Sequence, residues 1–105
     1  MSYQLQQNAL LPLLARTIVL NFGHNAGKQL FVKHTNEGGN GPEAYKIIKT
    51  LCALKAMVTW NCEKVARICR ERTGGAGFLA TNIIGDTVMG SHAGMTAEGD
   101  NKVLM

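Results

Sequence analysis

One run of apolar residues, repeated every three or four positions, restricts the folds open to this chain more than any other sequence feature. The run comprises Ile47, Leu51, Leu54, Val58, Cys62, Val65 and Cys69. This spacing places side chains along one face of a helix, whereas a strand would alternate every second residue. Pro42 suits the first turn of a helix, and Glu63 can pair with Arg67 one turn later. The pattern predicts a long helix over about residues 42–72.

A second helix is predicted over about residues 3–34. Its apolar positions recur at the same intervals and form one face: Leu11, Leu14, Ile18, Phe22, Ala26 and Leu30. Pro12 should kink or restart this helix. Residues 35–42 are rich in glycine, asparagine and proline, which is a loop composition. The two helices are therefore expected to pack antiparallel across this loop.

The last third of the chain is rich in glycine. Seven of the chain's 12 glycines follow Thr73, so we predict a loop-rich segment over residues 73–95, with a short helix or turn around residues 82–89. Residues 96–105 are expected to start another helix, with carboxylates in its first turn. The predicted fold class is all-α: two long antiparallel helices of a bundle and a glycine-rich segment. Their apolar faces need a partner chain or neighbouring segments to cover them.

Length, charge and cysteine content set further limits. A chain of 105 residues has room for one domain with a modest core, and its 46% hydrophobic and 17% charged residues are typical of globular proteins. The net charge of +4 is spread singly along the predicted helices, which argues against nucleic-acid binding. Three cysteines without a Cys-x-x-Cys pair favour a reducing compartment. The most apolar run, residues 9–22, is too short to span a bilayer, so we expect a soluble intracellular protein that does not enter a membrane.

Glycines 75 and 77 match part of the dinucleotide-binding fingerprint, in the stretch Gly75-Ala76-Gly77-Phe78-Leu79-Ala80. That fingerprint requires a strand before it, and here a long helix precedes it. From the residues alone, Gly74 and Gly75 are interpreted as a helix stop in left-handed geometry. The three histidines show no metal-ligand spacing, so no metal site is predicted. Cys62 and Cys69 are interpreted as small buried hydrophobic residues.

Two carboxylates and an amide lie together in Glu98-Gly99-Asp100-Asn101. At a helix start such residues act as caps. A carboxylate beside a glycine also allows a substrate to approach a general base closely. The residues by themselves leave both interpretations open.

Four stretches, in order, resemble the acyl-CoA oxidase branch of the acyl-CoA dehydrogenase superfamily. They are Tyr3 to Gln7 leading into Leu10 to Ala15, Leu54-Lys55-Ala56, Cys69-Arg70-Glu71 through Gly74-Gly75-Ala76-Gly77-Phe78, and Glu98-Gly99-Asp100-Asn101-Lys102-Val103-Leu104-Met105. The resemblance covers nearly the whole chain, and the last two stretches are its most specific parts. Glu-Gly-Asp-Asn favours the oxidases over the dehydrogenases, in which Glu-Gly-Thr is more usual.

This resemblance implies an FAD-dependent enzyme of fatty acid β-oxidation in the peroxisome. Such an enzyme oxidises a fatty acyl-CoA to the trans-2-enoyl-CoA and transfers the electrons to O2, producing H2O2. The resemblance implies that Glu98 is the catalytic base, with Gly99 beside it at the substrate. Gly74 and Gly75 are expected against FAD, typically that of the neighbouring subunit, and Asn101 is expected to contact FAD too. A homodimer with shared active sites is therefore implied.

The chain also departs from its relatives. Ala97 replaces an aromatic residue before the base, which leaves the preferred acyl chain length open, and Thr73 replaces a cysteine before the glycine pair. The family places a helical domain and a β-domain before this region and more helices after it. We therefore expect residues 1–105 to be part of the C-terminal helical domain, inactive alone. Two alternatives stay open: a non-catalytic helical interaction module, and an acyl-CoA dehydrogenase with a protein electron acceptor.

Overall fold

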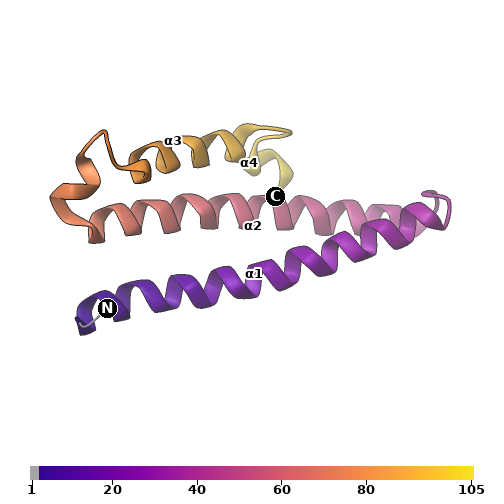
Figure 1. Ribbon diagram of the computed structural model, residues 1–105. Helices are drawn as coiled ribbons and strands as arrows, with labels where there is room; N and C mark the ends of the chain where they lie inside the picture. The colour runs from indigo at the N-terminus through magenta and orange to yellow at the C-terminus, as the bar shows by residue number, and fades with distance from the viewer. Residues whose placement is uncertain (1–2) are drawn as a thin grey trace.

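The computed structural model describes residues 3–105, and every regular element within them is a helix (Figure 1). Two long helices, α1 (Gln4–Asn36) and α2 (Pro42–Arg72), run antiparallel. A short 3-10 helix, η1 (Gly74–Phe78), then leads into α3 (Ile83–Thr96) and a final turn, α4 (Asn101–Leu104). The predicted all-α fold class is confirmed.

Helix α2 is the centre of the fold. Helix α1 lies along one side of it and α3 along the other, and α2 contacts every other element (Figure 1). Small residues occupy the close approaches, since Ala56 and Ala66 are buried on α2 and Gly27 is buried on α1. A Cβ atom at Gly27 would lie 2.5 Å from Cδ1 of Leu54. The glycine therefore lets α1 come close to α2 at this point.

The predicted apolar face of α2 lies between its two neighbours. Most of its members are half-buried, with Cys62 as the exposed exception. The expected ion pair between Glu63 and Arg67 is present, with Nε of Arg67 3.4 Å from Oε1 of Glu63. The helix predicted from the three- and four-residue spacing of apolar residues is therefore confirmed.

The apolar stripe of α1 does not face α2. Leu14, Ile18 and Phe22 are 56%, 47% and 69% exposed, whereas Leu13, next to Leu14, is buried. Pro12 lies inside the helix, and α1 continues on both sides of it. Since α2 takes up only a narrow face of α1, the stripe stays uncovered within residues 3–105.

Two expectations about the last third are wrong. Residues 83–96 form a continuous helix, where a loop-rich segment with only a short helix or turn around residues 82–89 was predicted. Asn82 caps this helix: its side chain accepts a hydrogen bond from N–H of Ile84 at 3.0 Å. Packing against α2 offsets the low helix propensity of its glycines. The helix expected from residue 96 begins only at Asn101, where the side chain of Asp100 accepts from N–H of Lys102 at 2.8 Å.

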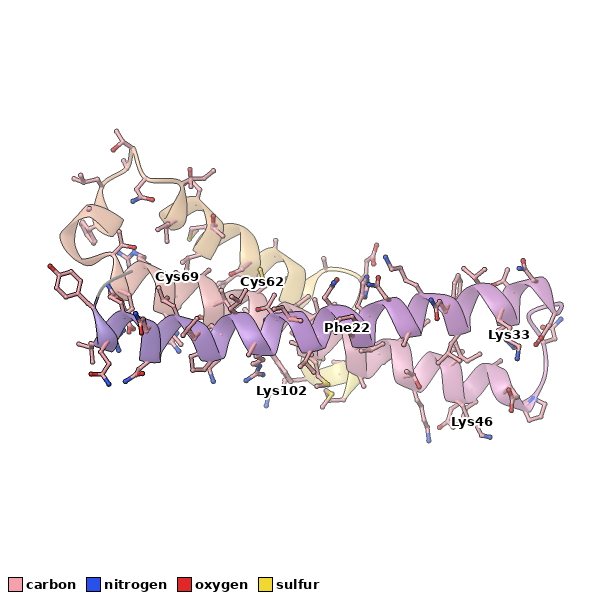
Figure 2. The ribbon with its side chains drawn as sticks, turned by 60° about the horizontal axis from the view of Figure 1, so that its bottom comes forward. Phe22, Lys33, Lys46, Cys62, Cys69 and Lys102 are labelled. Carbon is pink, nitrogen blue, oxygen red and sulfur yellow. The ribbon has the colours of Figure 1, made fainter. Side chains whose placement is uncertain are left out.

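The basic residues are dispersed and partly paired. Figure 2 shows Lys33 and Lys46 at the end of the hairpin where α1 joins α2, away from Cys62 and Cys69. Lys33 lies 3.9 Å from Glu37, and Lys46 lies 3.8 Å from Glu43. Among residues 3–105, no helix combines the length and the apolarity needed to cross a membrane.

Candidate functional site

Glu98 lies in the turn between α3 and α4. It is the one non-glycine residue among residues 3–105 with a positive φ, 56°, and the following Gly99 has a φ of 110°. Side chains rarely adopt this left-handed conformation, and residues held in it cluster at functional sites. The Glu98 side chain is exposed, and its carboxylate forms no hydrogen bond or ion pair within residues 3–105. The turn thus presents a carboxylate that can meet a ligand.

Lys55 of α2 holds this turn. Its ammonium group donates hydrogen bonds to the carbonyl oxygens of Gly99 at 2.6 Å and Met95 at 3.2 Å, and to Oδ1 of Asn101 at 2.8 Å. No role for Lys55 was predicted from the sequence. In the sequence, Lys55 stood out only as part of the Leu54-Lys55-Ala56 stretch that resembles the family. Contacts across 40 or more residues do not appear in the local periodicity of a sequence.

Asn101 is buried, with 2% of its surface exposed. Its Nδ2 donates to Oγ1 of Thr59 at 2.8 Å and to the carbonyl of Ala56 at 3.5 Å, and its Oδ1 accepts from Lys55. Both amide hydrogens are therefore used within the fold. The Asn101 side chain thus has its partners within the chain, and its predicted contact with FAD stays a prediction.

Gly99 has a structural explanation of its own. Besides the positive φ, a Cβ atom at this position would lie 3.2 Å from Cδ2 of Leu104. The position therefore favours glycine with or without a substrate. The substrate contact of Gly99 remains a prediction.

The glycines after α2 differ in what they require. Gly74 has a φ of 67°, which ends the helix in the left-handed geometry that was predicted. A Cβ atom at Gly77 would lie 2.8 Å from the carbonyl oxygen of Arg70. At Gly75 the φ is not positive, and no atom lies within 4 Å of such a Cβ. The fold explains Gly74 and Gly77 but gives no reason for a glycine at 75.

A shallow pocket of about 370 Å³ opens beside the glycine pair. Its lining comprises Arg70, Glu71, Gly74, Gly75 and Phe78. The guanidinium of Arg70 lies over the ring of Phe78, 5.3 Å from its centroid. Exposed backbone without side chains, next to a cation and an aromatic ring, fits the close approach of a planar, anionic cofactor.

The glycine pair and Glu98 lie at opposite ends of α3 (Figure 1). This helix of 14 residues is about 20 Å long at 1.5 Å per residue, and it lies between the two. One chain therefore does not bring the two parts of the predicted site together.

A second, apolar groove of about 360 Å³ lies between α1, α2 and α3, with Cys62 and Cys69 in its wall (Figure 2). Cys62 is exposed and Cys69 half-buried, so the interpretation of Cys62 as a buried residue is wrong. Oδ1 of Asn61, also in the wall, is buried without a hydrogen-bond partner among the described residues. No group of three or more metal-binding side chains occurs within residues 3–105.

The family model for the acyl-CoA oxidase C-alpha1 domain matches residues 1–105. The chain belongs to the acyl-CoA oxidase family. It is 37% identical to "Acyl-coenzyme A oxidase 3, peroxisomal" of Arabidopsis thaliana over 100% of the chain. It is 28% identical to "Peroxisomal acyl-coenzyme A oxidase 1" of Rattus norvegicus over 100% of the chain, and 27% identical to "Acyl-coenzyme A oxidase 1" of Yarrowia lipolytica over 97%.

The chain spans only 15% of the length of the Arabidopsis oxidase, 16% of the rat oxidase and 17% of the Yarrowia oxidase. No solved structure gives a significant match. The resemblance drawn from the four sequence stretches is thus confirmed, and the match is to the oxidase branch that Glu98-Gly99-Asp100-Asn101 favoured. The roles of the individual residues are left as predictions.

Proposed function

We propose that this chain supplies the base-bearing helical segment of an FAD-dependent acyl-CoA oxidase, which converts a fatty acyl-CoA to the trans-2-enoyl-CoA. Membership of the acyl-CoA oxidase family supports the reaction class. The observation that carries the proposal is Glu98, an exposed, unpaired carboxylate held in left-handed geometry beside a glycine. FAD supplies a hydride acceptor that O2 reoxidises with release of H2O2.

In this proposal Glu98 removes the proton from the carbon next to the thioester while the hydrogen on the following carbon leaves as hydride. A base must come within about 3 Å of the proton it takes, so the backbone around it has to be slim. Gly99 has no side chain and Ala97 a small one, which leaves room on both sides of the carboxylate. The acyl chain of the substrate would pass beside this turn.

Gly75 is the best candidate for contact with FAD, because the fold itself places no demand for glycine there. The distance of about 20 Å along α3 separates it from Glu98. The two cannot touch the same flavin ring, so we propose that the glycine pair contacts the FAD of a second subunit. This supports a homodimer with shared active sites.

The relatives above from Arabidopsis and rat have names that place them in the peroxisome, and we propose the same location for this chain. A segment that spans 15% of a relative lacks most of the expected substrate pocket. The 105 residues alone should therefore have no oxidase activity and retain no flavin after desalting.

The test uses a chimeric oxidase, in which residues 1–105 replace the matching segment of the Arabidopsis relative. We expect acyl-CoA-dependent H2O2 formation from it, and a loss of about 10²–10⁴-fold in kcat on Glu98→Gln, the range seen for general bases. Retained flavin absorbance would show that the variant is folded and loaded. Glu37→Gln, which changes another exposed carboxylate, is the control and should keep full activity.

Wild-type kcat in the Glu98→Gln chimera would refute the base assignment. A folded, dimeric chimera that binds FAD and acyl-CoA but shows neither acyl-CoA-dependent bleaching of the flavin nor H2O2 formation would instead favour the non-catalytic interaction module.

A further inference from the structure

The Lys55 side chain of α2 holds the Glu98 turn in place through three hydrogen bonds. All three hydrogens of the Lys55 ammonium are used, in bonds of 2.6 Å to Gly99, 2.8 Å to Asn101 and 3.2 Å to Met95. These acceptors stand on both sides of Glu98 in the sequence. The side chain is half-buried, so water competes less for its bonds to Met95 and Asn101 than at an open surface, whereas the bond to Gly99 is exposed.

The end of α3 and the residues after it both need stabilising contacts from outside the turn. The last carbonyls of α3 have no partners within the helix, and a lysine near the end of a helix satisfies them and complements the helix dipole. Two consecutive residues with positive φ, Glu98 and Gly99, follow directly. A strained conformation of this kind persists only when the surrounding structure holds it. Lys55 provides that hold at Met95, before the strained pair, and at Gly99, within it.

A second anchor lies one helical turn along α2. Thr59 is four residues after Lys55, so both side chains lie on the same face of the helix. Its hydroxyl accepts from Nδ2 of Asn101 at 2.8 Å, while Oδ1 of the same amide accepts from Lys55. Asn101 therefore links the two α2 side chains, which explains why this polar residue is buried at the start of α4.

We propose that Lys55 is a positioning residue for Glu98: it fixes the turn between α3 and α4 so that the carboxylate meets the substrate at the required distance. This inference rests on the proposed role of Glu98 as the base. Lys55 touches backbone and amide atoms, not the carboxylate, so it acts through the placement of the turn. A misplacement of about 1 Å can lower a rate a hundredfold, which makes small shifts of this turn matter.

The kinetic test replaces Lys55 in the chimeric oxidase. Lys55→Met keeps the length of the side chain and removes its three donors. We expect kcat to fall about tenfold to a hundredfold, with KM and flavin content unchanged. Lys55→Arg, which keeps a cation and several donors, should recover part of the loss. Lys64→Met is the matched control, since Lys64 is half-buried on the same helix and bonds to no side chain among residues 3–105.

A second readout uses the 105-residue chain itself. Hydrogen exchange of the Ala97 and Lys102 amides, which are hydrogen-bonded on either side of the turn, should be faster in Lys55→Met than in the wild type or in Lys64→Met. Should Lys55→Met fail to fold, Thr59→Val removes only the second anchor and should lower kcat about three- to tenfold by the same loss of placement.

The two proposals fail in different ways. Wild-type kcat in Lys55→Met or Thr59→Val, with Glu98→Gln inactive, overturns the positioning role alone. Wild-type kcat in Glu98→Gln removes the base itself, and the positioning role falls with it.

Discussion

At the scale of single residues, Glu98 has a backbone conformation that is unfavourable for a residue with a side chain, yet its side chain is the group that the proposed chemistry needs. Glu98 occupies a φ of 56°, which glycine would adopt with less strain. The left-handed conformation costs a residue with a Cβ atom about 1–2 kcal/mol. A carboxylate in this conformation supports the proposed role of Glu98, because strained residues cluster at functional sites.

Replacing Glu98 with glycine should therefore stabilise the chain while removing the carboxylate. The substitution relieves the strain, but glycine loses more entropy when the chain folds. The net increase in the free energy of unfolding should be about 0.5–1 kcal/mol. Thermal unfolding of the 105-residue chain, followed by circular dichroism at fixed concentration, should show a midpoint a few degrees higher. Glu98→Ala keeps the Cβ atom and should show no such gain. A lower midpoint for Glu98→Gly than for Glu98→Ala would contradict strain at this position, because both variants lack the carboxylate and differ only in the Cβ atom.

At the scale of elements, the glycines after α2 have different structural roles: the fold requires Gly77 but not Gly75. Gly77 is buried, with the carbonyl of Arg70 2.8 Å from where its Cβ would lie. Gly75, two residues before it, faces open space. Both belong to one glycine-rich motif, yet only Gly77 is required for packing.

We expect Gly77→Ala to destabilise the chain by about 1–3 kcal/mol, because backbone must move to admit the methyl group. Gly75→Ala should change stability by less than about 0.5 kcal/mol. In the chimeric oxidase, however, Gly75→Ala should reduce the FAD retained after desalting, since its methyl group would stand between the backbone and the cofactor. Equal flavin content in Gly75→Ala and wild type would count against contact between the glycine pair and FAD.

At the scale of the whole molecule, the chain is too thin to cover its own apolar surface. It extends 53 × 26 × 21 Å with a radius of gyration of 17.1 Å, against about 13 Å for a compact domain of this length. Only Leu13, Ala56 and Ala66 form a buried hydrophobic core among the described residues. The stripe of Leu14, Ile18 and Phe22 on α1 stays exposed. A stripe of this kind marks a surface that associates with other protein.

The isolated chain should consequently self-associate. Size-exclusion chromatography with light scattering should find a mass above that of the 11.3 kDa monomer, decreasing on dilution. The double substitution Ile18→Gln and Phe22→Gln should shift it toward the monomer, since it breaks the exposed stripe while keeping helix-compatible residues. Asn25→Gln, an exposed change on the same helix, is the control. A monomeric wild-type chain with cooperative unfolding would contradict this expectation.

Local patterns in the sequence determined a good part of this fold. The three- and four-residue spacing from Ile47 to Cys69 predicted α2, and the stop at Gly74 followed from the helix-ending preference of glycine. The glycines of residues 73–95 misled the prediction of a loop, because helix α3 forms through the Asn82 cap and its packing on α2. Propensity is a local quantity, and it does not include the free energy of packing on a neighbouring helix.

Some features of the candidate site were likewise predicted from the sequence, and others became visible only in the tertiary structure. Four sequence stretches indicated the family without any coordinates, and the family model confirms it. One of them, Glu98-Gly99-Asp100-Asn101, predicted the carboxylate of the candidate site. That Lys55 and Thr59 hold the turn, that Asn101 is buried, and that the apolar stripe of α1 is uncovered were decided by the tertiary structure alone. These facts depend on which faces of α1, α2 and α3 meet. The contacts join residues 40 or more positions apart, and no spacing within one segment of sequence can specify them.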